Sequence, residues 1–583
     1  MKVTFVQTTN RFFADTQMFG VHFMPVWAYT LASHLRGVSD VEISLFDDRF
    51  DDLLDIPAAD VFLLTGINQD YDAIASLQAS IRERFPKARL LVGGPISWSY
   101  KMAGKIDALA MFDHVVIGDG EEIIGDLIQS IRSGKSLPGV IESPRRFDFA
   151  RALPMDRELL NRTVSRYYGA VLEVSRGCPF LCEFCDIRVL PDNNRSHNKS
   201  PDLIVRELDH LYDLGVRQCL FACDNFIGEL SWAEEVCEKI IQWNERSGKK
   251  LSLYTWLTIN LSRTPRLIRK LRQAGFDMFF IGVESFHRTS LLETAKVQNT
   301  TLDLVAAIRL IQSFGFIVVA GLIFGFDTDP DEISGITLAG ILKSGLISGD
   351  PSLLTALPGT PLYQRMKLSN RLRNAKLGLG GFKYQTNIRY LKPAPQIRDD
   401  FKTFVKRFNR GAYQYQRLLS FYECLNSANY IAPQTAGYAD LKALFSMVLR
   451  KPKYIVLLWL RVFRLLRSPV RVYYVLKAFL LTFRENSPAR PLWFYFKIWL
   501  FTWSNSLVKY ANLSDADFDV ESVDARFDVA HVLPHGYEQE HSEQIPESKI
   551  RSQRRVTVSV LKEWIDAQWK LKRLGEPDRP AQL

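Results

Sequence analysis

The chain has 583 residues, of which 47% are hydrophobic, and it carries a formal net charge of +10 at pH 7. This length exceeds what one hydrophobic core organises, so the sequence excludes a single small domain and predicts two to four domains. The seven cysteines show no spacing typical of a disulfide framework, and the chain opens on a strand-like run, Met1–Val6, rather than on a basic and apolar leader. We therefore expect a cytoplasmic protein in a reducing compartment.

The positive charge is concentrated in one segment near the C-terminus. Residues 451–510 contain eleven Lys or Arg against one acid, Glu485, so this segment accounts for the whole net charge. We identify no nucleic-acid-binding module in the sequence, and the aromatic residues of this segment fall within apolar runs. The sequence therefore argues against a nucleic-acid partner.

Strand-like and helix-like stretches alternate over the first 140 residues, which predicts a doubly wound parallel sheet. The predicted strands are 3–6, 41–46, 61–65, 90–93 and 115–118, and the predicted helices are 25–36 and 71–85. Glycine turns follow three strands, at Thr65-Gly66, Gly93-Gly94 and Gly118-Asp119-Gly120-Glu121. Ligands bind at this edge of such sheets, and glycine lets the backbone approach a bulky group, although ordinary turn chemistry accounts for the same glycines.

Three cysteines, Cys178, Cys182 and Cys185, follow the strand-like run 170–174, and no fourth cysteine follows at ligand spacing. Thiolates so close in sequence can bind one iron–sulfur cluster, and a cubane with three protein ligands keeps one iron open for another ligand. A zinc site would require a fourth Cys or His nearby, and three buried thiols without a metal are the remaining alternative. The spacing therefore favours a reactive iron–sulfur cluster.

After the cysteines the chain reads as repeating strand–helix units, which predicts a partial or full (β/α) barrel. Its later strands are predicted at 218–222, 251–258, 278–283, 318–324 and 353–357, and its helices at 201–214, 232–246, 264–274 and 302–314. Active sites of such barrels lie at the carboxyl ends of the strands, so polar residues there are candidates for ligand contacts.

The Cys-x3-Cys-x-aromatic-Cys arrangement resembles that of the radical S-adenosylmethionine (SAM) superfamily, and the preceding glycine-marked domain is similar to that of the cobalamin-binding class. The resemblance implies a 4Fe-4S cluster on the three cysteines, with SAM on the open iron. It implies SAM contacts from Phe184, Asp224, Asn225, Thr258, Glu284, Ser285 and Ile323. Ordinary packing for Phe184, loop polarity for Thr258 and a structural salt bridge for Glu284 are the alternatives.

The same resemblance implies a cobalamin site in the N-terminal domain. The implied contacts are Thr65, Gly66, Gly93, Gly94, Gly118, Gly120 and Glu121. The loop Gln7–Phe13 lacks the Asp-x-His-x-x-Gly motif with which some relatives supply a histidine to cobalt. We therefore expect cobalamin without a protein histidine ligand, or a domain that has lost this cofactor.

Beyond residue 390 the sequence becomes helical, aromatic and basic. The apolar stretches 454–466, 472–483 and 492–503 are shorter than the about 20 residues that span a bilayer, and basic residues interrupt them. They predict either an amphipathic surface on an anionic membrane or a helical cap on the barrel. A further helix is predicted at 556–574.

These features predict an α/β fold in three parts. The parts are a Rossmann-like cobalamin-binding domain, 1–145, a radical SAM barrel, 146–390, and a helical C-terminal domain, 391–583, in a layout that resembles the hopanoid methylases.

The function that this resemblance implies is cobalamin-dependent C-methylation of an unactivated carbon in a lipid or other hydrophobic substrate. One SAM would methylate cobalamin and a second would supply the radical. The expected partners are an electron donor such as flavodoxin or ferredoxin and, through residues 451–510, the inner face of the membrane. A non-methylating radical cyclase, oxidase or rearrangement enzyme is the first alternative, and a non-catalytic cofactor sensor is the second. No residue identifies the substrate.

Overall fold

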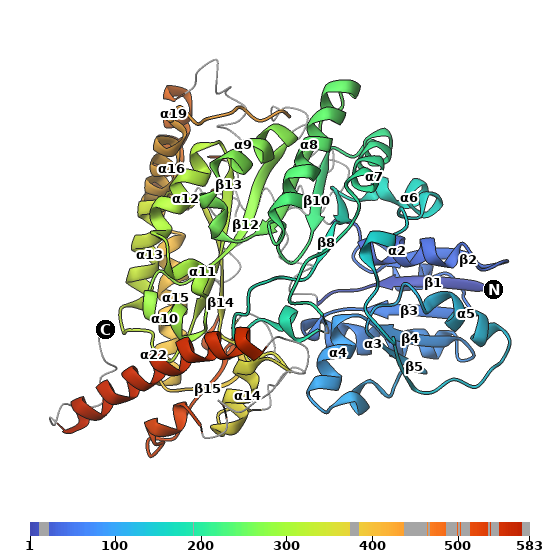
Figure 1. Ribbon diagram of the computed structural model, residues 1–583, viewed down its shortest axis with the longest axis horizontal. Coiled ribbons are helices and arrows are strands. Elements are labelled where there is room, and N and C mark those ends of the chain that lie inside the picture. Colours follow the sequence, from blue (N-terminus) through green and yellow to red (C-terminus); the bar gives the residue numbers. More distant parts are fainter. Residues whose placement is uncertain are drawn as a thin grey trace.

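The computed structural model describes residues 1–10, 23–190, 192–373, 384–435, 463, 467–485, 498–499, 502, 513–534, 537 and 547–573. Two parallel sheets dominate it. In Figure 1 the N-terminal sheet (blue) lies at the right, beside a larger α/β unit coloured from cyan to yellow. The expected mixed α/β architecture with a helical extension is confirmed.

The N-terminal sheet has the strand order β2-β1-β3-β4-β5-β6, and all neighbouring strands pair in parallel. Its strands are β1 (Lys2–Gln7), β2 (Glu42–Asp47), β3 (Val61–Thr65), β4 (Arg89–Gly93), β5 (His114–Ile117) and β6 (Val140–Glu142). All five predicted strands are present, and the short edge strand β6 adds to them.

Helices cover both faces of this sheet. One face packs against α2 (Val26–Leu35) and α5 (Ile124–Arg132), and the other against α3 (Tyr71–Arg84) and α4 (Pro95–Met102). The strands are apolar on both faces because each face is buried, which is typical of parallel sheets. The predicted helices 25–36 and 71–85 are confirmed.

The second sheet has the order β14-β13-β12-β11-β10-β7, again entirely parallel. Its strands are β7 (Ala170–Glu173), β10 (Gln218–Ala222), β11 (Ser252–Leu257), β12 (Phe276–Glu284), β13 (Ile317–Phe324) and β14 (Ser348–Leu353). The connecting helices are α7 (Pro201–Asp213), α8 (Leu230–Ser247), α9 (Pro265–Ala274), α12 (Leu304–Ser313) and α13 (Ile333–Ser344). Since β7 and β14 lie at opposite edges, the barrel is partial and six-stranded rather than closed.

The last strand of this barrel lies earlier in the chain than predicted. It runs over Ser348–Leu353, whereas residues 353–357 were predicted. Gly349, Asp350 and Pro351 disfavour a strand, and they obscured it. Pro351 is tolerated because β14 is an edge strand.

The C-terminal part packs helices on the β14 side of the barrel. It contains β15 (Gln385–Tyr390), α15 (Ala394–Phe408), α16 (Gly411–Leu425), α19 (Pro469–Arg484), β16 (Asp519–Ser522) and α22 (Glu547–Arg573). Helices α15 and α16 contact α13, α19 contacts α16, and β16 pairs with β15. The domain boundaries at 145 and 390 stay predictions.

Two predicted C-terminal helices coincide with helices of the structure. Helix α19 contains the predicted stretch 472–483, and α22 begins before the predicted 556 and is described to residue 573. The stretches 454–466 and 492–503 lie almost wholly outside the described residues. Among the helices that the structure describes, none is long and apolar enough to cross a bilayer.

Arg417 on α16 is a buried cation. Its guanidinium carbon lies 3.4 Å from the centre of the Phe408 ring, and its nitrogens have no hydrogen-bond partner among the described residues. Burial lowers the pKa of Arg417 to about 9. Because an unpaired buried cation is destabilising, we expect Arg417→Met to raise the free energy of unfolding by about 1–3 kcal/mol in urea titrations. Arg407→Met, an exposed substitution on α15, is the control, and a lower stability of Arg417→Met would contradict this expectation.

Candidate active site

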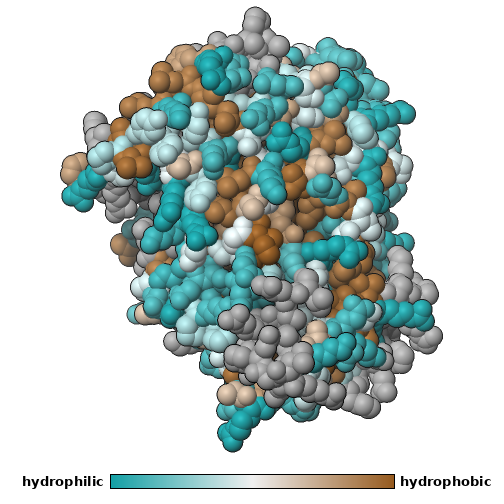
Figure 2. All heavy atoms as spheres, turned by 90° about the vertical axis from the view of Figure 1, so that its left-hand side faces the viewer, coloured by the Kyte–Doolittle hydropathy of each residue, from teal (hydrophilic) through white to brown (hydrophobic). Residues whose placement is uncertain are grey.

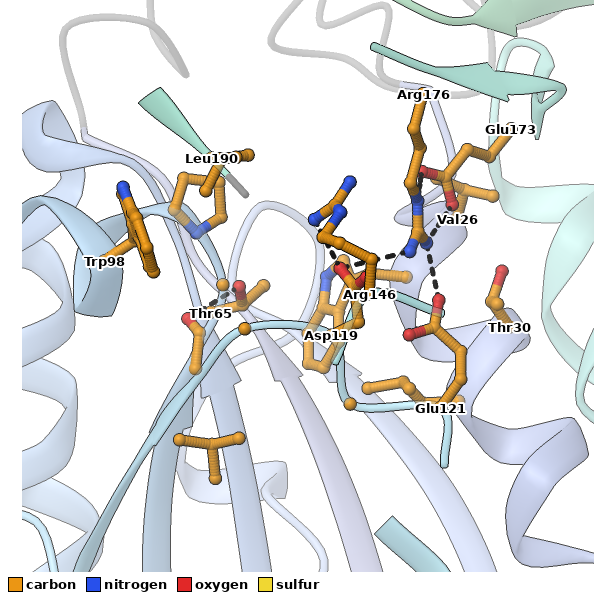
Figure 3. Close-up of a pocket in the computed structure, with 18 of the residues that line it drawn as sticks. Val26, Thr30, Thr65, Trp98, Asp119, Glu121, Arg146, Glu173, Arg176 and Leu190 are labelled. Atoms are coloured by element: carbon orange, nitrogen blue, oxygen red, sulfur yellow. Dashed lines mark hydrogen bonds and ion pairs between the residues drawn. The ribbon is translucent and has the colours of Figure 1, made fainter. Parts of the chain in front are cut away.

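The carboxyl ends of the two sheets face a common cavity of about 520 Å³. Figure 3 shows side chains from both sheets pointing into it. The N-terminal unit contributes α2 and the turns after β3, β4 and β5. The barrel contributes the turns after β7 and β10 and the end of β11, at Trp256. A ligand in this cavity would therefore contact both halves of the molecule at the edge where α/β sheets bind ligands.

The glycine turns form the wall of the cavity on the N-terminal side. Of the predicted cobalamin contacts, Thr65, Gly93, Gly94, Gly118, Gly120 and Glu121 line the cavity, whereas Gly66 does not. Thr65 Oγ1 donates a hydrogen bond to the Gly93 carbonyl at 3.0 Å. Gly94 has a φ of +80°, and an added Cβ would collide with Thr65 Oγ1. Gly66 lies beside Ile74 instead, and a Cβ added at Gly66 would collide with the Ile74 side chain.

Apolar side chains complete this wall, among them Trp27, Leu31 and Trp98, and Leu190 adds one from the barrel side. The glycine turns expose bare backbone, and the neighbouring side chains are apolar. This combination suits a broad, flat ligand. The residues present therefore fit the flat ring of a cobalamin.

The cysteine loop begins where β7 ends. The short strands β8 (Ser175–Arg176) and β9 (His197–Asn198) pair antiparallel and hold the two ends of the loop together. Gly177 has a φ of +92°, and an added Cβ would collide with the Arg195 carbonyl, so this position requires glycine. The Gly177 N–H donates a hydrogen bond to Asp224 Oδ2 at 2.6 Å, which joins the loop to the end of β10.

The three cysteine thiols lie within this loop. Cys182 is buried, and Cys178 and Cys185 are half-buried. Burial raises the pKa of Cys178 to about 11 and that of Cys185 well above its usual range. Thiols with a raised pKa stay protonated until a metal displaces the proton, so metal binding here releases protons.

Two side-chain amides are directed at the sulfurs. Asn225 Nδ2 lies 3.9 Å from Cys178 Sγ, and Gln298 Nε2 lies 3.5 Å from Cys182 Sγ. Donors of this kind suit thiolates that bind a cluster. No three His, Cys, Asp or Glu side chains converge on a single-ion site among the described residues. The thiolates of a cubane bind different irons, so their sulfurs need not converge on one point.

Several predicted SAM contacts lie beside the cysteine loop. Asp224 lines the cavity, and burial raises its pKa, which the hydrogen bond from Gly177 partly opposes. Thr258 Oγ1 lies 3.5 Å from Asn225 Oδ1 and also contacts Asn260. Asp224, Asn225 and Thr258 thus form one polar group next to Cys178.

The other predicted SAM contacts lie on β12 and β13 and in the cysteine loop. Glu284 has a φ of +64° and is ion-paired with buried Lys296 at 2.8 Å, so the structural salt bridge is present. Lys296 Nζ also lies 5.7 Å from the centre of the Phe184 ring. Ser285 accepts a hydrogen bond from the His287 N–H, and Ile323 is half-buried on β13. Contact of these residues with SAM stays a prediction.

Sequence reasoning missed an ionic network that joins the two sheets (Figure 3). Arg176, two residues before the first cysteine, pairs with Glu121 at 2.5 Å, Glu173 at 2.7 Å and Asp119 at 3.3 Å. Arg146 pairs with Asp119 at 2.9 Å. The position of Arg176 beside the cysteines was visible in the sequence. Its partners were not, because Glu121 lies 55 positions away.

The lining of the cavity has an excess of acidic side chains. Two arginines, Arg146 and Arg176, face five carboxyl groups: Asp119, Glu121, Glu173, Asp186 and Asp224. Burial raises the pKa of Asp186, as it does that of Asp224. This lining favours a ligand that carries positive charge.

Residues 172–335 match the family model of the radical SAM superfamily. The chain is 32% identical over 285 residues to the hopanoid C-2 methylase of Rhodopseudomonas palustris, a match that covers 48% of this chain and 52% of that protein. It thus spans about half the length of that relative. It is 28% identical over 400 residues to an uncharacterized methyltransferase of Synechocystis, covering 67% and 72% of the two chains.

Solved structures share the fold. OxsB, a cobalamin-dependent SAM radical enzyme solved with aqua-cobalamin, superimposes with a TM-score of 0.56 at 16% identity, covering 92% of this chain and 83% of that one. TsrM of Kitasatospora setae, a radical SAM methyltransferase, superimposes with a TM-score of 0.52 at 16% identity, covering 65% and 81%. The chain therefore contains a radical SAM domain within the fold of the cobalamin-dependent radical SAM enzymes, and the predicted resemblance is confirmed.

Proposed function

We propose that this protein, a member of the radical SAM superfamily, methylates an unactivated carbon of a hydrophobic substrate with the help of cobalamin. The observation that carries the proposal is the shared cavity, which is lined by the glycine turns of one sheet and, from the other, by residues of the cysteine loop that follow the cysteines, such as Asp186 and Ile187. Methyl transfer to a carbon radical requires a radical source and a methyl source on opposite sides of one substrate. A cavity lined from the edges of both sheets would meet this requirement.

We assign the three cofactors to three groups of residues. Cys178, Cys182 and Cys185 would hold the 4Fe-4S cluster, and the turns after β3, β4 and β5 would hold cobalamin. Asp224, Asn225 and Thr258 would bind SAM, with the Asp224 carboxylate receiving its ammonium group. When bound, the cluster and SAM supply a 5'-deoxyadenosyl radical, and cobalamin supplies a transferable methyl group. The acidic lining offsets the positive charge of SAM, and the apolar walls exclude water from the reacting carbon.

The apolar walls and the likeness to a hopanoid methylase support a lipid-like substrate. A flavodoxin or ferredoxin would supply the electron.

The test is anaerobic purification from cells supplied with cobalamin, followed by cofactor analysis and turnover with SAM, reductant and lipid extract. We expect a methylated product together with 5'-deoxyadenosine and S-adenosylhomocysteine. Deoxyadenosine without S-adenosylhomocysteine would overturn methylation and favour cyclisation, oxidation or rearrangement. Bound SAM that is never cleaved would overturn catalysis altogether.

Gly93 offers a variant that separates cobalamin binding from cluster binding. An added Cβ at Gly93 would lie 3.6 Å from Val116 Cβ, an ordinary contact, so alanine fits there. A leucine would extend into the cavity. We expect Gly93→Leu to lose cobalamin absorbance but keep its iron, and Gly93→Ala to keep both. Cobalamin retained by Gly93→Leu would contradict the assigned site.

We further propose that α19 rests on an anionic membrane. Val470, Tyr473, Leu476, Leu480 and Phe483 are exposed on this helix, with Val470 and Leu480 each 67% accessible. Their spacing of three or four residues places them on one face, while Val475, Ala478, Leu481 and Thr482 are buried. Figure 2 views the side of the molecule on which α19 lies and shows hydrophobic side chains among hydrophilic ones there. Arg467 precedes the helix, and Arg484, which pairs with Glu485, is its last residue. Basic residues at these positions suit anionic headgroups.

Leu480→Asp tests this membrane contact. We expect about tenfold weaker co-sedimentation with vesicles of equal parts phosphatidylcholine and phosphatidylglycerol, because a charge replaces an inserted side chain. Leu54→Asp, at an exposed leucine of the N-terminal unit, should bind as the wild type does. Added salt should weaken wild-type binding, since the basic residues contribute through screened charges. Equal binding of both variants would contradict the proposal.

A further inference from the structure

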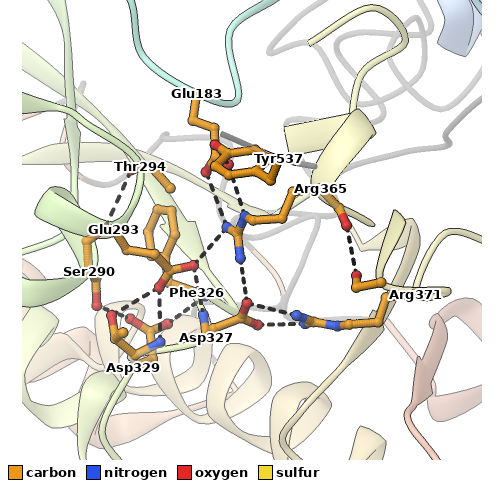
Figure 4. A network of polar contacts seen from close by, with 12 residues as sticks. Glu183, Ser290, Glu293, Thr294, Phe326, Asp327, Asp329, Arg365, Arg371 and Tyr537 are labelled. Atoms are coloured by element: carbon orange, nitrogen blue, oxygen red, sulfur yellow. Dashed lines mark hydrogen bonds and ion pairs between the residues drawn. The ribbon is translucent and has the colours of Figure 1, made fainter. Parts of the chain in front are cut away.

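Glu183 lies between the second and third cysteines, yet its side chain is held in a buried polar network (Figure 4). The side chain is 2% exposed. Both of its carboxylate oxygens accept hydrogen bonds from Arg365 of α14 (Pro361–Leu368), at 2.8 and 3.1 Å. The Glu183 N–H donates to the Thr294 carbonyl at 2.9 Å, and its own carbonyl accepts from the Leu362 N–H at 3.2 Å. Side chain and backbone of Glu183 are therefore both fixed.

Arg365 connects Glu183 to the wall of the barrel. Its guanidinium is fully buried and also binds Asp327 at 2.8 Å and Glu293 at 3.1 Å. Asp327 follows β13, and Glu293 ends α10 (Arg288–Glu293). Arg371 pairs with Asp327 at 2.5 Å. The cysteine loop is thus braced against two separate elements of the barrel through one residue.

Tyr537 brings the C-terminal part of the chain to the same carboxylate. Its hydroxyl donates a hydrogen bond to Glu183 Oε1 at 2.6 Å, although the two residues are 354 positions apart. The Tyr537 side chain is 1% exposed. The hydroxyl and the Arg365 guanidinium hold the same oxygen from different directions (Figure 4).

We propose that Glu183 is a positioning residue for the cluster and that Tyr537 clamps it from the C-terminal part of the chain. The inference rests on the cluster of the proposed function. Because Glu183 directly follows Cys182, its orientation sets the path of the segment between the two ligands. Partners that orient metal ligands in this way typically change metal affinity by about 10- to 100-fold.

Tyr537→Phe removes one hydroxyl and leaves the ring in place. We expect iron release to an anaerobic chelator to be about tenfold faster than in the wild type, together with an altered EPR spectrum of the reduced cluster. Tyr422→Phe is the matched control, because Tyr422 is equally buried and its hydroxyl contacts Thr482 of α19 at 3.1 Å. Each variant removes a buried tyrosine hydroxyl that makes a hydrogen bond, so a general loss of stability would appear in both. Faster iron release in Tyr537→Phe alone would be specific to the bond with Glu183.

Glu183→Gln provides a second measurement. Removing a negative charge beside the cluster should make reduction easier, so the midpoint potential should shift in the positive direction in an EPR-monitored titration. The inference is overturned if Tyr537→Phe releases iron at the wild-type rate with an unchanged spectrum, or if Glu183→Gln leaves the potential unchanged. A wild-type protein that assembles no cluster would instead overturn the proposed function, so the two failures are distinguishable.

Discussion

Cys182→Ala should eliminate the iron–sulfur cluster and, with it, SAM cleavage. The three cysteines lie on one short loop, and Cys182 is the buried one, with the Gln298 amide at its sulfur. Two remaining thiolates cannot hold a cubane that requires three. We expect iron and sulfide to fall to background and 5'-deoxyadenosine formation to fall by about 10³-fold or more, measured after anaerobic reconstitution.

Cys223→Ala is the control for this result. Cys223 lines the cavity between the two sheets, and burial raises its pKa to about 12, but its sulfur contacts Thr255 Oγ1 at 3.2 Å. We expect this variant to keep its iron. Iron lost from Cys223→Ala, or retained by Cys182→Ala, would contradict the proposed ligand set. Stoichiometric zinc in place of iron and sulfide would favour the zinc alternative instead.

The repeating pattern of both sheets was predictable because buried parallel strands are short, apolar and separated by helices. Leu90–Gly93 and Val318–Phe324 are typical, and both lie inside observed strands. The errors occurred at sheet edges. Strand β14 carries Gly349, Asp350 and Pro351, and β6 is short and largely exposed, so neither has the apolar pattern of a central strand. Whether the barrel closes depends on strand pairing, which local patterns do not encode.

Residues adjacent to a motif were predictable, and residues that meet through the fold were not. The position of Asp224 and Asn225 beside the cysteine loop was predictable because they follow a strand at its carboxyl end, and their contact with SAM stays a prediction. The pairing of Arg176 with Glu121 depends on how the two sheets face each other. The contact of Tyr537 with Glu183 depends on a chain path of several hundred residues. A buried charge near a motif indicates that a partner exists, but only the fold identifies the partner.

Arg365→Met should destabilise the protein more than any surface charge change. Arg365 contacts Glu183, Glu293 and Asp327, and its loss leaves three buried carboxylates with Arg371 as the remaining guanidinium in their network. Breaking such a buried group by removing one partner costs about 3–5 kcal/mol in the free energy of unfolding, which urea titration would measure. Arg389→Met is the control, because Arg389 pairs with Glu521 at the surface and should cost less than about 1 kcal/mol.

The same network predicts a pH dependence of stability. Burial and the charge of Asp327 raise the pKa of Glu293 from 4.5 to about 7. Burial opposes ionisation of Asp327 too, but Arg371 and Arg365 outweigh it and lower the pKa of Asp327, so Glu293 is the carboxyl that keeps a proton to higher pH. Folded Glu293 binds its proton more tightly than the unfolded chain does. Its contribution to stability is therefore greatest at low pH, declines as pH rises from about 4.5 to 7, and is constant above that.

Thermal unfolding across this pH range, compared between the wild type and Glu293→Gln, isolates the contribution of Glu293. We expect the decline to be smaller in Glu293→Gln, where other buried carboxyls with a raised pKa, such as Asp400, still titrate. In Arg365→Met it should extend to higher pH, because losing the guanidinium raises the pKa of Glu293 further. A pH profile of Arg365→Met that parallels the wild type would mean that Arg365 does not stabilise the ionised form of Glu293. The buried network would then depend on Arg371 and Asp327 alone, and the bracing of the cysteine loop through Arg365 would lose its electrostatic basis.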